Sequence, residues 1–281
     1  MNIEAHSASE NWRGNSLATQ LLWAAKDAWT ITRRDLSHWR QQPGTVLMIW
    51  FFPIMITLLF GLFFGGAIQV PNGGSYLEFL MPGMFTMTML FGLDTTVIAV
   101  TTDASRGVTD RFRSLPMAAS AVVFGRCIAD MLNSLVGLAI MLVAALLMGW
   151  RWHRGIDEAL LAICLLLLLR FALLWIGIFI GLSASGPEAV SSVQVLEWPV
   201  AFLSSVFVDP ATMPSWLGAI AQWNPLSAVA TTTRALFGSP GWQSGSWASV
   251  HSLWIALFWI ALLTAIFLPL SVKKYRGLHR G

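Results

Sequence analysis

Arg170 and Glu197 are the charged residues that fit least well with the sequence around them. Each lies near the middle of a long apolar run, at 157–183 and 188–208 respectively. A lone charge at the centre of a bilayer costs roughly 2.5–3.5 kcal/mol on insertion scales, so such groups are expected to find a partner. We therefore predict that Arg170 and Glu197 lie within salt-bridge reach or share a water-filled cavity. The pair could serve a substrate path or gate, or it could be a structural polar lock.

A second set of charged residues forms a compact segment at 103–118, between two apolar runs. The segment is too short to be a domain and too charged to lie in lipid. A loop of this kind can be gripped by a soluble partner, because arginines make charge-assisted contacts to acidic or phosphorylated groups. The alternative is that its arginines only keep the loop on one side of a membrane. The charged residues are Asp103, Arg106, Asp110, Arg111 and Arg113.

Several kinds of chemistry have no matching motif in this sequence. A phosphate-binding P-loop needs Gly-Lys, and that dipeptide does not occur. The five histidines are scattered and lack the spacing of metal ligands, and neither G-x-S-x-G nor H-E-x-x-H is present. We therefore predict no catalytic site, no bound metal and no cofactor held by this chain.

The elements that must position these residues are long apolar helices. The chain is 56% hydrophobic and 11% charged, against about 25% charged residues in a typical soluble domain. Apolar runs of about 20 residues or more indicate an all-α polytopic membrane protein. The basic residues sit at the ends of these runs and not on one folded face, so nucleic-acid binding is not expected. We predict six spans, at about 44–68, 79–102, 119–148, 157–183, 188–208 and 249–270.

Three further segments complete the expected organisation. Residues 1–16 are polar and are expected to be disordered, and residues 17–42 read as an amphipathic interfacial helix with a basic face. The longest connection, 209–248, is rich in Trp, Pro, Gly and Ser, as expected at a lipid–water boundary. We expect it to hold two short interfacial or re-entrant helices, at 214–222 and 226–237.

The basic residues also predict the orientation. With both termini in the cytoplasm, thirteen of the 17 Lys and Arg residues lie inside and three outside, with Arg170 within a span. The opposite topology would reverse this ratio, so the positive-inside rule places 103–118 in the cytoplasm and 209–248 outside. The three external residues are Arg151, Arg154 and Arg234.

Other polar or small residues lie inside the predicted spans. Asp94 and Asp130 are toward the cytoplasmic halves of the second and third spans, where we expect them to face water or neighbouring helices. Gly177 and Gly181 are spaced so that two helix backbones can approach closely.

Several short motifs follow one another along the chain in a fixed order. They are Met81-Pro82-Gly83-Met84, Arg106-Gly107, Asp110-Arg111, Leu115-Pro116-Met117, Gly125-Arg126, Met213-Pro214-Ser215-Trp216-Leu217, Asn224-Pro225-Leu226-Ser227 and Arg234-Ala235-Leu236-Phe237-Gly238. Their order resembles that of the ABC type-2 exporter permeases, in particular the daunorubicin and drug-resistance branch. The resemblance covers about residues 20–275. One departure is that residues 103–106 read Asp-Ala-Ser-Arg, where many members have a Glu-Arg pair.

The resemblance implies a membrane subunit that exports a hydrophobic or amphipathic molecule, drug or lipid-like, across the plasma membrane. Separate cytoplasmic ATPase subunits, using ATP and Mg, would drive it, and a second permease copy or paralogue would complete the pathway. The elbow helix at 17–42 and the loop at 103–118 would receive the ATPase. The residues implied in this coupling are Arg33, Arg34, Arg106, Asp110, Arg111 and Arg113, and those of the external motif are Asn224, Pro225 and Arg234.

Two other classes of function remain as alternatives at this point. A gradient-driven secondary transporter would need a set of buried titratable or ion-binding groups and often shows an internal repeat. An intramembrane enzyme would need a catalytic constellation. A neighbouring gene with a nucleotide-binding motif would favour the ABC permease over both.

Overall fold

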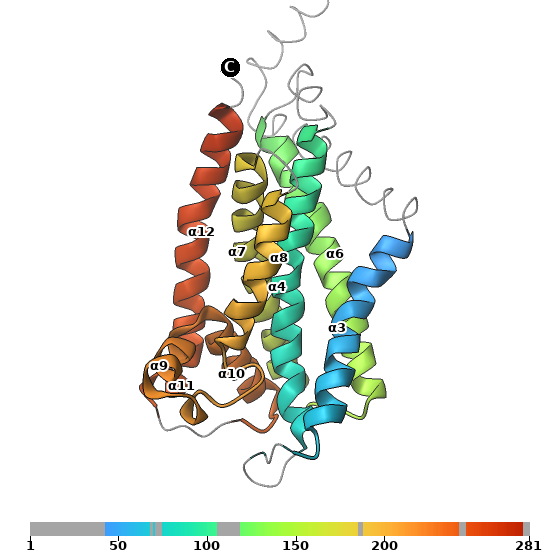
Figure 1. The fold of residues 1–281 in the computed structure, drawn as a ribbon, viewed down its shortest axis with the longest axis vertical. Helices are drawn as coiled ribbons and strands as arrows, with labels where there is room; N and C mark the ends of the chain where they lie inside the picture. The colour runs from blue at the N-terminus through green and yellow to red at the C-terminus, as the bar shows by residue number, and fades with distance from the viewer. Residues whose placement is uncertain are drawn as a thin grey trace, which may run out of the picture.

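The computed structural model describes residues 43–67, 70, 75–105, 119–184, 188–241 and 246–277. All regular structure within these ranges is helical (Figure 1). The predicted disordered segment at 1–16 and the predicted amphipathic helix at 17–42 lie outside the described residues. The same holds for residues 106–118 of the predicted loop.

Five helices of the described chain are long and apolar enough to cross a membrane. They run alongside one another in the bundle of Figure 1. Their positions agree with five of the predicted spans, although several ends shift by a few residues. They are α3 (Pro43–Phe64), α4 (Tyr76–Ser105), α6 (Ala119–Leu147), α7 (Ile156–Ser183) and α12 (Ser252–Gly277).

The predicted fifth span differs from the prediction in its second half. Helix α8 (Glu188–Phe202) has 15 residues and ends well before position 208. Pro199 lies in its last turn, where it lacks the N–H that would continue the hydrogen-bond ladder. An irregular segment at 203–209 follows, and then the short 3-10 helix η2 (Pro210–Thr212). The prediction of one continuous helix over 188–208 is therefore wrong beyond Phe202.

Three short helices lie at the end of the bundle opposite the last turns of α12 (Figure 1). Two of them, α9 (Ser215–Trp223) and α10 (Pro225–Phe237), occupy the positions of the two predicted short helices. The third, α11 (Trp247–Val250), precedes α12. Helix α10 ends at Gly238, whose φ of 70° is in the left-handed region that favours glycine at this cap position.

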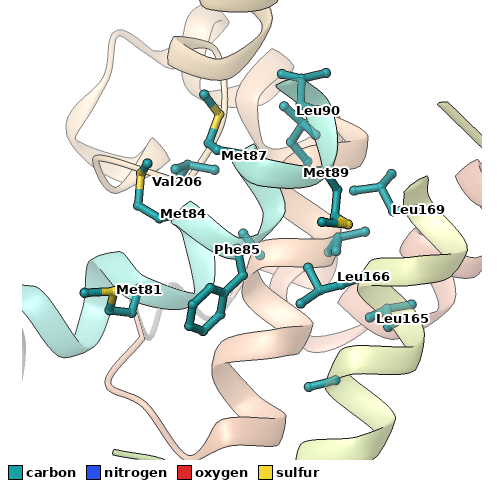
Figure 2. Packing of buried hydrophobic residues seen from close by; sticks show 14 of the residues in the cluster. Met81, Met84, Phe85, Met87, Met89, Leu90, Leu165, Leu166, Leu169 and Val206 are labelled. Atoms are coloured by element: carbon teal, nitrogen blue, oxygen red, sulfur yellow. The ribbon is translucent and has the colours of Figure 1, made fainter. Parts of the chain in front are cut away.

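Helices α4 and α7 form the centre of the bundle. In the apolar stretch of α4, 61% of the residues are buried, and in that of α7, 56%. In the apolar stretch of α3 only 11% are buried. Figure 2 shows Met89 of α4 on the side that faces the leucines Leu166 and Leu169 of α7, whereas Met84 lies beside Val206. The two backbones approach closely at Gly177, which has no Cβ. A Cβ there would lie 2.8 Å from the Cβ of Thr96.

Candidate functional site

The six residues that were predicted to couple the chain to an ATPase all lie outside the described residues. Their role therefore stays a prediction. The helix ends that flank 106–118 are described, and an ion pair joins them. The Arg126 Nη1 atom of α6 donates to the Asp103 Oδ2 atom of α4 over 2.6 Å. A carboxylate in the last turn of a helix is opposed by the helix dipole, and Arg126 compensates this charge.

The most buried charge of the described chain is Arg170, on α7, whose side chain is 0% exposed. Its Nη2 forms an ion pair with the Asp130 carboxylate of α6 and donates to Thr96 Oγ1 of α4 over 2.6 Å. Its Nε donates to Ser134 Oγ over 2.7 Å. Asp130 and Ser134 lie one turn apart on α6, so they face α7 together. Arg170 thus joins the three helices α4, α6 and α7.

Gly92 of α4 makes room for this guanidinium. A Cβ at Gly92 would lie 2.6 Å from Arg170 Nε and 2.7 Å from Cζ, which is too close for any side chain larger than hydrogen. Breaking a buried ion pair by removing one partner typically destabilises a protein by about 3–5 kcal/mol. The arrangement therefore fixes the register of α4 against α7.

Glu197 on α8 lies in a second polar group next to the first. Its side chain is 5% exposed, and its Oε1 accepts a hydrogen bond from the Asp94 backbone N–H at 3.3 Å. Gln194, one turn before Glu197, donates from Nε2 to Asp94 Oδ2 over 3.2 Å. These bonds attach α8 to the middle of α4.

The structure corrects one of the two predicted arrangements of Arg170 and Glu197. The carboxylate paired with Arg170 is that of Asp130, because Arg170 points to where α4 and α6 meet α7, whereas α8 packs mainly on α4. Both side chains contact α4, Glu197 at the Asp94 N–H and Arg170 at Thr96 Oγ1. Whether the two charges serve a substrate path or a polar lock stays a prediction.

Asn224 connects the irregular segment after α8 to α10. Its side-chain oxygen caps α10 by accepting from Leu226 N–H at 2.9 Å, and Pro225 follows at the first helical position. Its Nδ2 donates to the carbonyls of Val200 at 2.9 Å and Leu203 at 2.7 Å. Carbonyls at a helix end lack partners within the helix, and Asn224 supplies them here.

Arg234 stabilises the same segment from the other end of α10. Its side chain is 2% exposed, and its Nε and Nη2 donate over 2.9 Å to the carbonyls of Phe79 and Val206. Its Cζ lies 3.9 Å from the centre of the Phe79 ring, a cation–π contact. Burial lowers the pKa of Arg234 to about 9, which leaves the guanidinium charged at neutral pH.

The contact between Arg234 and Val206 explains why a glycine stands at position 83 of the Met-Pro-Gly-Met motif. A Cβ at Gly83 would lie 2.9 Å from Arg234 Nη2 and 3.0 Å from the Val206 carbonyl oxygen. Ser227 adds a bond from the Ser205 N–H to its hydroxyl at 2.8 Å. The residues of the predicted external motif therefore hold the non-helical segment at 203–209 by hydrogen bonds.

Sequence reasoning missed Thr96 and Ser134 and did not assign Asp130 to Arg170. The spacing of Asp130 and Ser134 by four residues places both on one helix face, which is a readable signal. In the described part of the chain, no group of three His, Cys, Asp or Glu residues could hold a metal ion. The buried polar contacts of Arg170, Glu197 and Arg234 can fix the positions of their helices and transmit a movement of one helix to the next.

Comparisons with known proteins match this chain to one family and to several relatives. The sequence pattern of the family described as ABC-2 type transporter matches residues 26–237. The chain is 33% identical over 247 residues to the "Daunorubicin resistance ABC transporter permease protein DrrB1" of Streptomyces coeruleorubidus, covering 87% of this chain and 84% of that protein. It is 22% identical over 210 residues to the "Probable doxorubicin resistance ABC transporter permease protein DrrC" of Mycobacterium tuberculosis, covering 74% and 76%.

Proposed function

This chain belongs to the ABC-2 type transporter family, and on that premise we propose that it exports a hydrophobic or amphipathic molecule from the cytoplasm. It is the permease component, a membrane subunit without catalytic activity of its own. Membership of the family implies a partner ATPase. That partner would bind ATP and Mg, since the chain contains no P-loop.

The observation that carries the proposal is that one helix, α4, takes part in the Asp103–Arg126 ion pair, in the polar groups around Arg170 and Glu197, and in the contacts of Arg234. Its last turn holds Asp103, its middle holds Gly92, Asp94 and Thr96, and its first turns hold the Phe79 carbonyl. Thirty helical residues span about 45 Å, at 1.5 Å per residue. A force applied at 106–118 would move α4 against the buried side chains of Arg170 and Arg234, which both bond to it.

We propose six membrane crossings, with α8 and the segment after it as the fifth. Both termini and 106–118 would be cytoplasmic, 209–248 would be external, and the membrane would be the plasma membrane. The arrangement in Figure 1 supports this, because the last turns of α4 and α12 lie at one end of the bundle and α9–α11 lie at the other. The distribution of Lys and Arg supplies the direction.

A second permease copy or paralogue would complete the pathway. Helix α3 exposes large apolar side chains over most of its surface, such as Met48 at 74% and Leu62 at 79%. Lipid can cover such a surface. Helix α8, in contrast, exposes Ser191 and Gln194 together with Val195, and a face of mixed polarity fits a protein partner or a water-filled path better than lipid.

The substrate class follows from the interior and from the relatives. The described core consists mainly of Met, Leu, Phe and Ala, which favour apolar ligands. Two relatives carry resistance to daunorubicin or doxorubicin in their names. We propose drugs or lipid-like molecules of this amphipathic kind, with Arg33, Arg34, Arg106, Asp110, Arg111 and Arg113 on the ATPase side.

Transport in a defined system tests the proposal. Inside-out vesicles that hold the permease and its partner ATPase should accumulate doxorubicin when ATP and Mg are added. Accumulation should be lost when the lysine of the partner's P-loop is replaced. Accumulation by the permease alone, driven by a proton gradient, would contradict the proposal.

A further inference from the structure

A cavity of about 370 Å³ lies beside α10, at the end of the molecule that carries α9 and α11. Small-molecule sites typically span roughly 300–1,000 Å³, so the cavity is large enough for a ligand and not only for a single ion. Seven of its fifteen lining residues are serine or threonine. Its walls come from α10, α11, the turn at 239–241 and the start of α12, with Ser205, Pro210 of η2 and Gln222 of α9.

Arg234 is one of the residues that line this cavity, and it is 2% exposed. A guanidinium has five N–H donors, and the carbonyls of Phe79 and Val206 occupy two of them. Among the residues that the structure describes, no carboxylate lies within 4 Å of Arg234. Asp209 and the Tyr76 hydroxyl act on it only from farther away. The charge is therefore buried without an ion-pair partner in this part of the chain.

The hydroxyl groups around it add further donors. Ser252 is 8% exposed, and its hydroxyl makes no hydrogen bond to the described part of the chain. The Thr231 hydroxyl lies 3.4 Å from that of Ser205, a weak contact that a better acceptor could replace. An arginine with several hydroxyls matches a group that presents several anionic oxygens, because charged acceptors form the stronger hydrogen bonds.

We propose that this cavity binds a phosphate group, through Arg234 and the hydroxyls of Thr231 and Ser252. A bare ammonium ion would be repelled by Arg234, and a purely apolar ligand would leave the hydroxyls without partners. The phosphate could belong to the headgroup of a bilayer lipid or to a soluble phosphoester. The inference does not depend on the proposed export function, because it concerns binding to the isolated chain.

Thermal unfolding of the purified full chain in a neutral detergent tests the proposal. The probes are dihexanoyl phosphatidylglycerol, glycerol 3-phosphate, inorganic phosphate and glycerol, each at the same ionic strength. We expect phosphate-bearing probes to raise Tm saturably and glycerol to leave it unchanged. A response to the lipid probe alone identifies a lipid headgroup, and an equal response to glycerol 3-phosphate or inorganic phosphate identifies a soluble source.

The variants avoid Arg234, whose side chain also holds the fold. Ala235 lines the cavity, so Ala235→Phe should fill it and abolish the shift. Ala211 is exposed on η2 and does not line the cavity, so Ala211→Phe is the matched control. Thr231→Val with Ser252→Ala should weaken the apparent affinity by roughly tenfold or more, as expected for lost bonds to a charged group.

The proposal is overturned if phosphate probes stabilise no more than sodium chloride does. It is also overturned if glycerol is as effective as glycerol 3-phosphate, or if the shift persists in Ala235→Phe. Should Ala235→Phe fail to fold, an unchanged affinity in the variant that combines Thr231→Val with Ser252→Ala overturns the proposal instead.

Discussion

The Arg126 Nη1 atom lies 2.6 Å from the Asp103 Oδ2 atom, and this ion pair joins α6 to α4 at the two helix ends that flank residues 106–118. Both side chains are largely buried, at 19% and 16% exposure, so the pair is better shielded than a surface ion pair. A displacement of the connecting segment would therefore reach both helices together.

Reversing Asp103 should uncouple transport from ATP hydrolysis. Asp103→Arg places two cations against each other at the helix ends and should lower ATP-dependent transport at least severalfold. The double variant Asp103→Arg with Arg126→Asp restores opposite charges and should recover part of the activity. The measurement is ATP-dependent doxorubicin uptake together with the ATPase rate in the same vesicles.

The ATPase rate distinguishes uncoupling of transport from a local folding defect. The ATPase rate should remain near the wild-type value in Asp103→Arg while uptake falls. If uptake is unchanged in the single variant, the pair has no part in coupling.

Breaking the buried pair of Arg170 and Asp130 should destabilise the bundle strongly. Arg170→Met or Asp130→Asn leaves one polar partner without its counterpart, and each should lower the free energy of unfolding by about 3–5 kcal/mol. The double variant Arg170→Met with Asp130→Leu removes both charges and should be less destabilised than the single variants. Tryptophan fluorescence during unfolding in detergent measures these differences.

The same double variant separates the two roles of the Arg170 region. If the charges are a structural lock, a double variant that folds should also transport. If they belong to a substrate path or gate, it should fold and fail to transport. Single variants as stable as wild type would show that the buried pair is not formed.

Asn224 should matter more than an ordinary helix cap. Asn224→Ala removes the cap of α10, worth about 1 kcal/mol, and leaves the part-buried carbonyl of Leu203 unpaired at about 1–3 kcal/mol, whereas water can reach the exposed carbonyl of Val200. Asn224→Asp keeps the cap but loses both donors, so it should remain strongly destabilised. Ser215→Ala, at the exposed start of α9, is the control and should change stability by less than about 0.5 kcal/mol. Full stability of Asn224→Asp would contradict the bridging role.

Gly92→Ala should disturb the packing of α4 on α7. The added methyl would lie 2.6 Å from Arg170 Nε, so the guanidinium or the helix has to shift, and overpacking of this kind costs about 1–3 kcal/mol. Gly66→Ala is the matched control, because its Cβ would meet nothing within 4 Å. A thermal unfolding temperature of Gly92→Ala equal to that of Gly66→Ala would show that the contact is absent.

Much of the helical layout can be read from the sequence because lipid-length apolar runs are a strong one-dimensional signal. The runs behind α4, α6 and α7 predict those helices to within a few residues, and Asn224-Pro225 together with Gly238 marks both ends of α10. The end of α8 was missed because hydrophobic residues continue to Val208 beyond it. The irregular segment at 203–209 is stable because Asn224 and Arg234 donate hydrogen bonds to its carbonyls, and hydropathy does not reveal these partners.

The pairing of buried charges was predicted less well, because it depends on which helices are neighbours. Hydropathy indicates the depth of Arg170, Glu197 and Asp130 but not the side of each helix. Arg170 was therefore paired with Glu197 and not with Asp130, although the spacing of Asp130 and Ser134 on one face of α6 was a readable signal. The need for a partner was predictable from the desolvation of a charge, but the identity of that partner was not.

The claim that 103–118 receives the ATPase is tested most directly by reversing two of its charges. Arg111→Glu with Arg113→Glu changes the charge by the same amount as Lys273→Glu with Lys274→Glu, a control at exposed positions near the end of α12. The measurement is co-purification of the partner ATPase together with ATP-dependent doxorubicin export. We predict that the arginine variant loses both and that the lysine variant keeps both. Survival of both assembly and export in the arginine variant would contradict the account.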